Sequence, residues 1–247
     1  MITLIAPAKV TRFLEVTGVR ADGYHLLRSE MVSVGLVDRL VLDESADYLR
    51  VVGHGVVPAD ESNLVRRALA LVGRRAGVTL DKQIPTGGGL GGGSSDAAAI
   101  LRWAGGVDAA SAATLGADVP FCQVGGRALV EGVGEIVTPL AYEELALTLL
   151  LPDFAVATPQ VYRAYDELVA SGERPSGTNH LEAAARRVEP RLARLLDWAR
   201  ANYGDAHLAG SGSTIFVEGT IFASPYGDVT GPDGAVKWCQ TIATPAA

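Results

Sequence analysis

The sequence predicts an α+β fold of two domains, with a ligand site in the cleft between them. Three observations lead to this prediction. Residues 2–52 follow strand patterns almost throughout, whereas the second half of the chain mixes strands with helices. A glycine-rich loop at residues 87–93 joins a strand to a helix, and the composition shifts near residues 139–144. We therefore expect one domain over residues 1–142 and a second over residues 143–247.

The composition suits a globular protein with a sizeable core. The chain has 247 residues, of which 48% are hydrophobic, enough for one large or two small cores. The formal charge of -7 and the lack of a basic stripe argue against general binding to nucleic acid. The N-terminal residues run straight into a strand pattern, and no segment has the ~20 apolar residues of a membrane span. We expect a soluble, cytoplasmic protein with no membrane partner.

Cysteine and histidine give no pattern typical of a disulfide framework or a metal site. The two cysteines are too few for either. The histidines are not spaced as metal ligands. They are His25, His54, His180 and His207. We predict no structural metal.

The first half contains predicted strands and one amphipathic helix. A helical apolar stripe covers residues 62–76, with Asp60 or Ser62 as its N-cap and Gly77 at its end. Alternating apolar and polar residues predict strands over residues 9–16, 30–37, 39–42 and 78–82.

The glycine-rich loop is the strongest local signal for a ligand. Six of the seven residues 87–93 are glycine, which disfavours both strand and helix. Ser94, Ser95 and Asp96 are typical N-cap residues, and the alanines behind them favour a helix. Bare amides at a helix N-terminus bind anions, so we expect phosphate here; a plain surface turn is the alternative. The loop lacks the Gly-Lys-Ser/Thr of a Walker A motif, since its nearest lysine, Lys82, precedes it.

Two charged residues have competing local interpretations. Lys9, early in an apolar strand, is either a snorkelling residue at a strand edge or a functional cation. Asp118, two residues before Pro120, is either a turn aspartate bonded to its own backbone or a semi-buried carboxylate with a chemical task. The local sequence alone favours the structural interpretation for both.

The second half is predicted to alternate strands and helices. Residues 109–115 indicate a short helix and residues 125–135 a strand pair. Helices are expected to begin at Thr158 and Pro190, and Asn179 is the expected N-cap of another that runs through Val188. Further strands are predicted over residues 145–151, 214–217 and 236–242, whereas residues 220–234 are expected to be irregular.

Taken together, these motifs resemble the GHMP kinase superfamily, whose phosphate loop has the form Pro-x-x-x-Gly-Leu-Gly-x-x-Ser-Ser. They occur in the family's order along nearly the whole chain: residues 7–9, 20–25, 87–96, 115–121, 131–135 and 210–213. The resemblance implies a two-domain GHMP kinase fold with the active site in the cleft between the domains. The Asp-Gly-Tyr-His and Gly-Ala-Asp-Val-Pro segments are most similar to the branch that phosphorylates the 2-hydroxyl of a cytidyl diphosphate derivative of methylerythritol, in the non-mevalonate isoprenoid pathway. ATP and Mg²⁺ are the implied cofactors.

The resemblance also assigns residues to the reaction. It implies that Asp118 takes the proton of the substrate hydroxyl and that Lys9 lies beside it. Tyr24 and His25 would recognise cytosine, while Tyr162 would stack on the base, although its helix stripe also suits a core residue. The residues assigned to ATP are Asn63, Lys82, Pro85, Gly87, Gly88, Gly89, Leu90, Gly91, Gly92, Gly93, Ser94 and Ser95.

One departure from the family keeps two other functions open. Thr11 is assigned to the substrate, but it stands where the family usually has asparagine and offers a single hydroxyl. A kinase for another small alcohol, such as homoserine or a mevalonate derivative, is one alternative. A non-catalytic ligand sensor on the same fold is the other, although the chain retains both Lys9 and Asp118. The sequence leaves the oligomeric state open.

Overall fold

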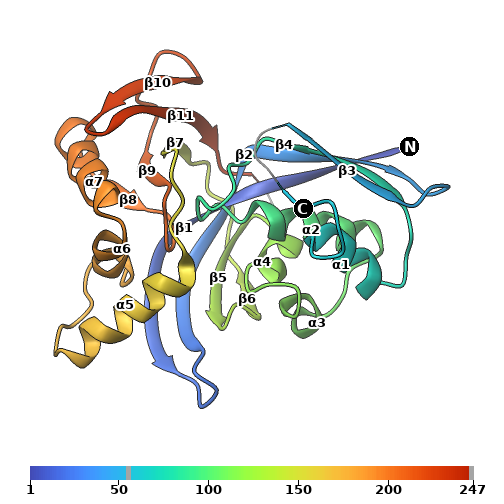
Figure 1. The fold of residues 1–247 in the computed structure, drawn as a ribbon, viewed down its shortest axis with the longest axis horizontal. Coiled ribbons are helices and arrows are strands. Elements are labelled where there is room, and N and C mark those ends of the chain that lie inside the picture. The colour runs from blue at the N-terminus through green and yellow to red at the C-terminus, as the bar shows by residue number, and fades with distance from the viewer. Residues whose placement is uncertain (54–56, 245–247) are drawn as a thin grey trace.

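The computed structural model describes residues 1–53 and 57–244, which form two β-sheets with associated helices (Figure 1). The first sheet contains β1 (Ile2–Val19), β2 (His25–Asp43), β3 (Tyr48–Gly53), β4 (Gly77–Lys82), β5 (Arg127–Gly132) and β6 (Ile136–Pro139). Its helices are α1 (Leu64–Leu71), α2 (Gly92–Trp103), α3 (Ala109–Ala113) and α4 (Val119–Val124). The second sheet contains β7 (Ala146–Leu151), β8 (Ala206–Leu208), β9 (Ile215–Glu218), β10 (Tyr226–Gly231) and β11 (Gly234–Ile242). Its helices are α5 (Thr158–Ala170), α6 (Glu182–Val188) and α7 (Pro190–Tyr203).

Strand β2 organises the first sheet. On one side it pairs with β1 over almost its full length, and on the other side residues 39–43 pair with β4 and residues 27–32 with β5. These pairs are antiparallel, whereas β3 joins β4 in parallel. Helices α1, α2 and α4 share one apolar cluster with this sheet, and residues 97–101 of α2 are fully or almost fully buried. The alanines of α2 therefore pack tightly enough to fix the helix that follows the glycine-rich loop.

The second sheet is antiparallel and has the strand order β10-β11-β7-β9-β8. Val161, Ala184 and Leu192 bring α5, α6 and α7 into its apolar cluster. A further cluster lies where the two sheets meet and includes Val10 of β1 and Phe216 of β9. The sheets are thus joined by apolar packing as well as by the chain.

The β1–β2 hairpin continues past the first sheet and lies beside α5 (Figure 1). Leu14 of this hairpin is buried in the apolar cluster of the second sheet and forms a backbone bridge with Asn179. The Asn179 side chain accepts the amide of Leu181 and donates to the carbonyls of Leu208 and Gly210. The buried Asn179 amide group therefore links the approach to α6 with β8 and the loop after it, and the backbone on either side of Asn179 holds the hairpin at Leu14.

The structure confirms the α+β class, and it corrects the first predicted helix. Helix α1 is shorter than predicted, and Asn63 is its N-cap in place of Asp60 or Ser62, since the Asn63 side chain accepts the amide of the second helical residue. Gly73 adopts a positive φ of 61° just beyond the C-cap, which stops the helix early. Gly77 accordingly opens β4 and does not end the helix.

The tail is the second correction. Residues 220–234, predicted to be irregular, contribute β10 and its turn into β11. The hairpin is covered by aromatic packing, because the Phe222 ring stacks on Trp238 with 4.1 Å between ring centroids. Its glycine and proline content hides the strand pattern in the sequence. The boundary between residues 142 and 143 falls in the connection from β6 to β7 and stays a prediction. Among the described residues, no helix is long and apolar enough to cross a membrane.

Asn179→Ala is expected to destabilise the fold by about 1–3 kcal/mol, because two buried backbone carbonyls and one amide lose their partner. The matched control is Asn202→Ala on the exposed side of α7, where the side chain donates to a single carbonyl, that of Trp198. Urea unfolding of both variants measures the difference. Equal stability of the two variants would contradict the linking role of Asn179.

Candidate active site

Lys9 and Asp118, far apart in the sequence, meet in the structure. The Lys9 Nζ lies 3.3 Å from the Asp118 Oδ2 and donates to the Thr11 Oγ1 over 3.2 Å. The Lys9 side chain is buried, whereas 29% of the Asp118 side chain is exposed. A buried cation thus holds a carboxylate that remains open to a ligand.

The structure decides between the local interpretations of these two residues. Lys9 is an internal ion-pair residue and does not snorkel at a strand edge. Asp118 immediately precedes α4, a helix that the sequence did not indicate, yet its side chain caps no backbone amide. The carboxylate is therefore available to Lys9, and the turn interpretation was wrong.

The glycine-rich loop lies against β1 and against the loop over residues 209–214. The Lys9 amide donates to the Leu90 carbonyl over 2.9 Å, and the Thr214 amide donates to the Gly88 carbonyl over 3.1 Å. A Cβ atom at Gly89 would lie 2.6 Å from the Ala209 carbonyl oxygen. These approaches exclude side chains, so the composition of the loop follows from its packing.

Helix α2 begins earlier than the predicted caps. Its N-cap is Gly91, at a φ of 66°, and a Cβ there would lie 2.9 Å from the Lys9 Cγ. The first hydrogen bond of the helix runs from the Ser95 amide to the Gly91 carbonyl, which leaves the amides of Gly92, Gly93 and Ser94 pointing out of the helix end. Such a terminus favours an anion such as phosphate.

The loop encloses a pocket of about 300 Å³. Most of the residues assigned to ATP line it: Lys82, Pro85, Gly87, Gly88, Gly89, Leu90, Gly91, Gly92, Gly93 and Ser94, with Leu64, Ile84 and Thr86. Ser95 is buried and donates its hydroxyl to the Pro7 carbonyl over 2.6 Å, so that hydroxyl secures α2 to β1. Asn63 is nearly buried as the cap of α1, and its side-chain amide donates to the Pro58 carbonyl.

Lys82 takes part in a buried charge cluster below the pocket. Its Nζ donates to Asp38 and, over 2.8 Å, to the Asp96 Oδ2. Burial alone would lower the pKa of Lys82, but Asp96 and Asp38 together raise it. Burial, with a smaller contribution from the charge of Asp38, raises the pKa of Asp96 to about 7. One cation thus faces two carboxyl groups, and the second of them holds a proton more readily than usual.

Asp38 is a residue that the sequence analysis missed. It sits between the two segments predicted as separate strands, yet β2 runs through it without interruption. Its Oδ1 accepts the amides of Gln83 and Ile84 at the entry to the glycine-rich loop. The signal was a charged residue inside an apolar strand, but its partner Lys82 becomes visible only in the folded sheet.

The residues assigned to cytosine gather at the tip of the β1–β2 hairpin and on α5. The His25 ring stacks on Tyr162 with 4.7 Å between centroids, and His25 Nε2 lies 2.7 Å from the Asp166 Oδ1. Burial, with a smaller effect from the charge of Asp118, raises the pKa of Tyr162. Tyr24 is largely exposed, with the Arg20 guanidinium 5.4 Å from its ring centroid. Asp166 is a further residue that the sequence analysis missed.

Comparison with known proteins gives consistent matches. The family model described as GHMP kinases N terminal domain matches residues 63–126. A 4-diphosphocytidyl-2-C-methyl-D-erythritol kinase of Thermus thermophilus is 38% identical, over 96% of this chain and 91% of that protein. A kinase of the same name from Nitrosomonas eutropha is 36% identical, over 88% of each chain.

Two solved structures are similar to this chain over nearly its whole length. A crystal structure of 4-(cytidine 5'-diphospho)-2C-methyl-D-erythritol kinase superimposes with a TM-score of 0.73 at 35% identity, covering 98% of this chain and 100% of that one. A mevalonate kinase from L. major, in complex with R-mevalonate, superimposes with a TM-score of 0.62 at 16% identity, covering 100% of this chain and 97% of that one. The second likeness shows the fold alone.

Asp96→Asn is expected to change how stability depends on pH. Because the folded-state pKa of about 7 exceeds the ordinary value of about 3.9, this carboxyl group stabilises the wild type fully below about pH 4 and loses that contribution as the pH rises to about 7. The variant should therefore gain stability relative to the wild type across that window, by at most about 1.4 kcal/mol per pH unit. Urea unfolding between about pH 5 and pH 8 measures the difference. Asp228→Asn on exposed β10 is the control, and a difference independent of pH would contradict the assignment.

Proposed function

Since the chain belongs to the family of 4-diphosphocytidyl-2-C-methyl-D-erythritol kinases, within the GHMP kinases, we propose that it transfers the γ-phosphoryl group of ATP to the 2-hydroxyl of 4-diphosphocytidyl-2-C-methyl-D-erythritol. The observation that carries the proposal is the Lys9–Asp118 pair beside the glycine-rich loop. We place the reaction in the cytoplasm, as a step of the non-mevalonate isoprenoid pathway. Residues 1–142 would form the ATP-binding domain and residues 143–247 the substrate-side domain.

In the proposed reaction, the substrate oxygen attacks the γ-phosphorus, the bond to the β,γ-bridging oxygen breaks, and ADP leaves. Asp118 accepts the proton of the hydroxyl as it attacks. Lys9, held by Thr11 and Asp118, offsets the negative charge on the transferred group. The amides at the start of α2 would hold the phosphates in line, which is the main requirement of phosphoryl transfer.

Mg²⁺ is proposed to arrive with ATP. The described part of the chain contains no group of three His, Cys, Asp or Glu side chains placed to hold a metal ion, and His54 lies outside the described residues. A Mg²⁺ ion that arrives on a nucleotide needs no such group, because phosphates, waters and one or two protein oxygens usually hold it. The Ser94 hydroxyl, at the start of α2 and in the lining of the pocket, is the protein oxygen we propose for it. When bound, the ion would neutralise charge on the phosphates.

Cytosine recognition is proposed for His25. Because a carboxylate only accepts hydrogen bonds, the contact with Asp166 places the proton on His25 Nε2. In a neutral ring Nδ1 is then an acceptor, which suits the exocyclic amino group of cytosine. The expected stacking of Tyr162 on the base is revised here, because the Tyr162 ring lies against His25 with 4.7 Å between ring centroids, which leaves no room for a base between them. We propose that the base meets the edge of His25 and that Tyr162 supports the imidazole ring from behind. Tyr24 would lie near the sugar or the base.

Asp118→Asn and Lys9→Ala are each expected to lower kcat by about 10² to 10⁴. ADP release with Mg-ATP measures turnover, with the cytidyl substrate, homoserine and mevalonate compared as acceptors. Asp153→Asn, an exposed aspartate after β7, is the matched control and should retain full activity. Turnover on another alcohol would assign a different substrate to the Thr11 site. Tight ATP binding without turnover on any acceptor would favour a ligand sensor.

A further inference from the structure

Strand β1 carries a bulge beside the proposed catalytic site. Thr11 pairs with Met31, but Phe13 pairs with Glu30, so Arg12 is an extra residue with no partner on β2. A bulge bends its strand and changes the direction of the neighbouring side chains. The bulge therefore adjoins Thr11 and lies three residues from Lys9.

The other side of β1 is anchored at two points that flank this bulge. The Lys9 amide donates to the Leu90 carbonyl, and the Leu14 amide donates to the Thr178 carbonyl, each over 2.9 Å. Thr11 and Arg12 lie between these two anchors. Their position depends on what holds the bulge itself.

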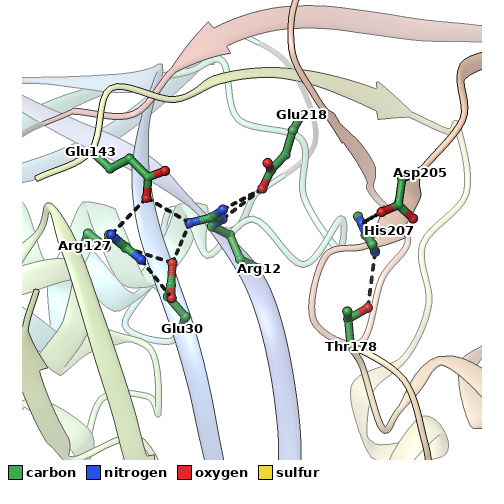
Figure 2. Close-up of polar contacts among 8 residues, drawn as sticks. All are labelled: Arg12, Glu30, Arg127, Glu143, Thr178, Asp205, His207 and Glu218. Carbon is green, nitrogen blue, oxygen red and sulfur yellow. Dashed lines mark hydrogen bonds and ion pairs between the residues drawn. The ribbon is translucent and has the colours of Figure 1, made fainter.

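The Arg12 side chain supplies that hold (Figure 2). Its Nη1 donates to the Glu30 Oε1 over 2.7 Å, and its Nε and Nη2 donate to the Glu218 Oε1 over 3.1 and 2.7 Å. A weaker contact of 3.4 Å reaches Glu143 in the connection between the two sheets. Arg127 of β5 fixes Glu30 and Glu143 in turn, each over 2.9 Å. We call these five residues the Arg12 cluster.

The Arg12 cluster joins the two sheets. Glu30 lies on the central strand of the first sheet, and Glu218 ends β9 of the second. Burial alone would lower the pKa of Arg12, but Glu218 and Glu30 raise it, so the guanidinium stays charged. Glu218 and Glu143 are about half exposed, and ion pairs at such sites add little stability by themselves. The planar guanidinium of Arg12 instead fixes geometry, because it holds Glu30 on β2 and Glu218 on β9 in one orientation.

We propose that Arg12 is a positioning residue for phosphoryl transfer: by gripping Glu30 and Glu218 it fixes the bulge in β1, and the bulge holds Thr11 and Lys9 in register with Asp118. This inference rests on the proposed function. Arg12 does not touch the reacting atoms, and its effect passes through the backbone of β1. Misplacement of catalytic groups by about 1 Å costs roughly 10² in rate.

The test compares Arg12→Lys with Arg127→Lys. Lysine keeps the charge at either position, but a single ammonium cannot reproduce the planar fork. Arg12→Lys should lower kcat by roughly 10 to 10², with the KM for ATP changed less than about twofold. Arg127→Lys disturbs the same cluster without touching the bulge and should keep kcat within about twofold. Equal losses in the two variants, or an unchanged kcat in Arg12→Lys, would overturn the proposal.

Two further measurements separate positioning from loss of stability. In a Lys9→Ala background, Arg12→Lys should cause no further loss of kcat, because its effect acts through Lys9; losses that multiply would count against the proposal. Glu218→Ala removes both acceptor oxygens of one partner at a half-exposed site and should lower kcat in the same direction. An unchanged kcat in that variant would also overturn the proposal.

Failure of the proposed function and failure of this inference give different results. A wild type that phosphorylates none of the acceptors overturns both. An active wild type whose kcat is unaffected by Arg12→Lys overturns this inference alone.

Discussion

Close backbone approach between the glycine-rich loop and β1 is the constraint on which the site depends. The hydrogen bond from the Lys9 amide to the Leu90 carbonyl brings the N-terminus of α2 beside the Lys9–Asp118 pair. A side chain at Gly91 would collide with Lys9, and one at Gly89 with the loop after β8. One loop therefore serves two purposes: Gly89 and Gly91 let it dock between two parts of the fold, and Gly92 and Gly93 present their amides to an anion.

Charged groups fix the register of elements around this contact. The cluster of Lys82, Asp38 and Asp96 joins β4, β2 and α2 directly beneath the loop. Burying one cation with two carboxyl groups is costly unless one of them takes up a proton, in accord with the raised pKa of Asp96. The gain is geometric: the ammonium group of Lys82, on the strand before the loop, ties β2 to α2, and the Asp38 carboxylate also holds the entry to the loop.

Features set by local sequence were predictable, and features set by distant partners were not. The glycine run, the strand alternation and the apolar stripe of α5 are local patterns, and they located the loop, the strands and that helix. The start of α2 was misplaced because Ser95 and Asp96 look like caps, yet their partners are Pro7 and Lys82 elsewhere in the fold. Residue spacing alone could not pair Lys9 with Asp118; the family resemblance was needed. The role of each site residue stays a prediction.

The β1–β2 hairpin shows why the site does not divide cleanly between two domains. Its residues serve both apolar cores, with Ala6 and Met31 in the core of the first sheet and Leu14 in that of the second. A chain boundary near residue 142 separates the sheets but not these contacts. The hairpin also carries, along its length, the lysine of the ion pair, the bulge at Arg12 and the tip at His25. Because one continuous pair of strands bears all three, their spacing along the chain follows from the register of the hairpin and from the bulge at Arg12 within it.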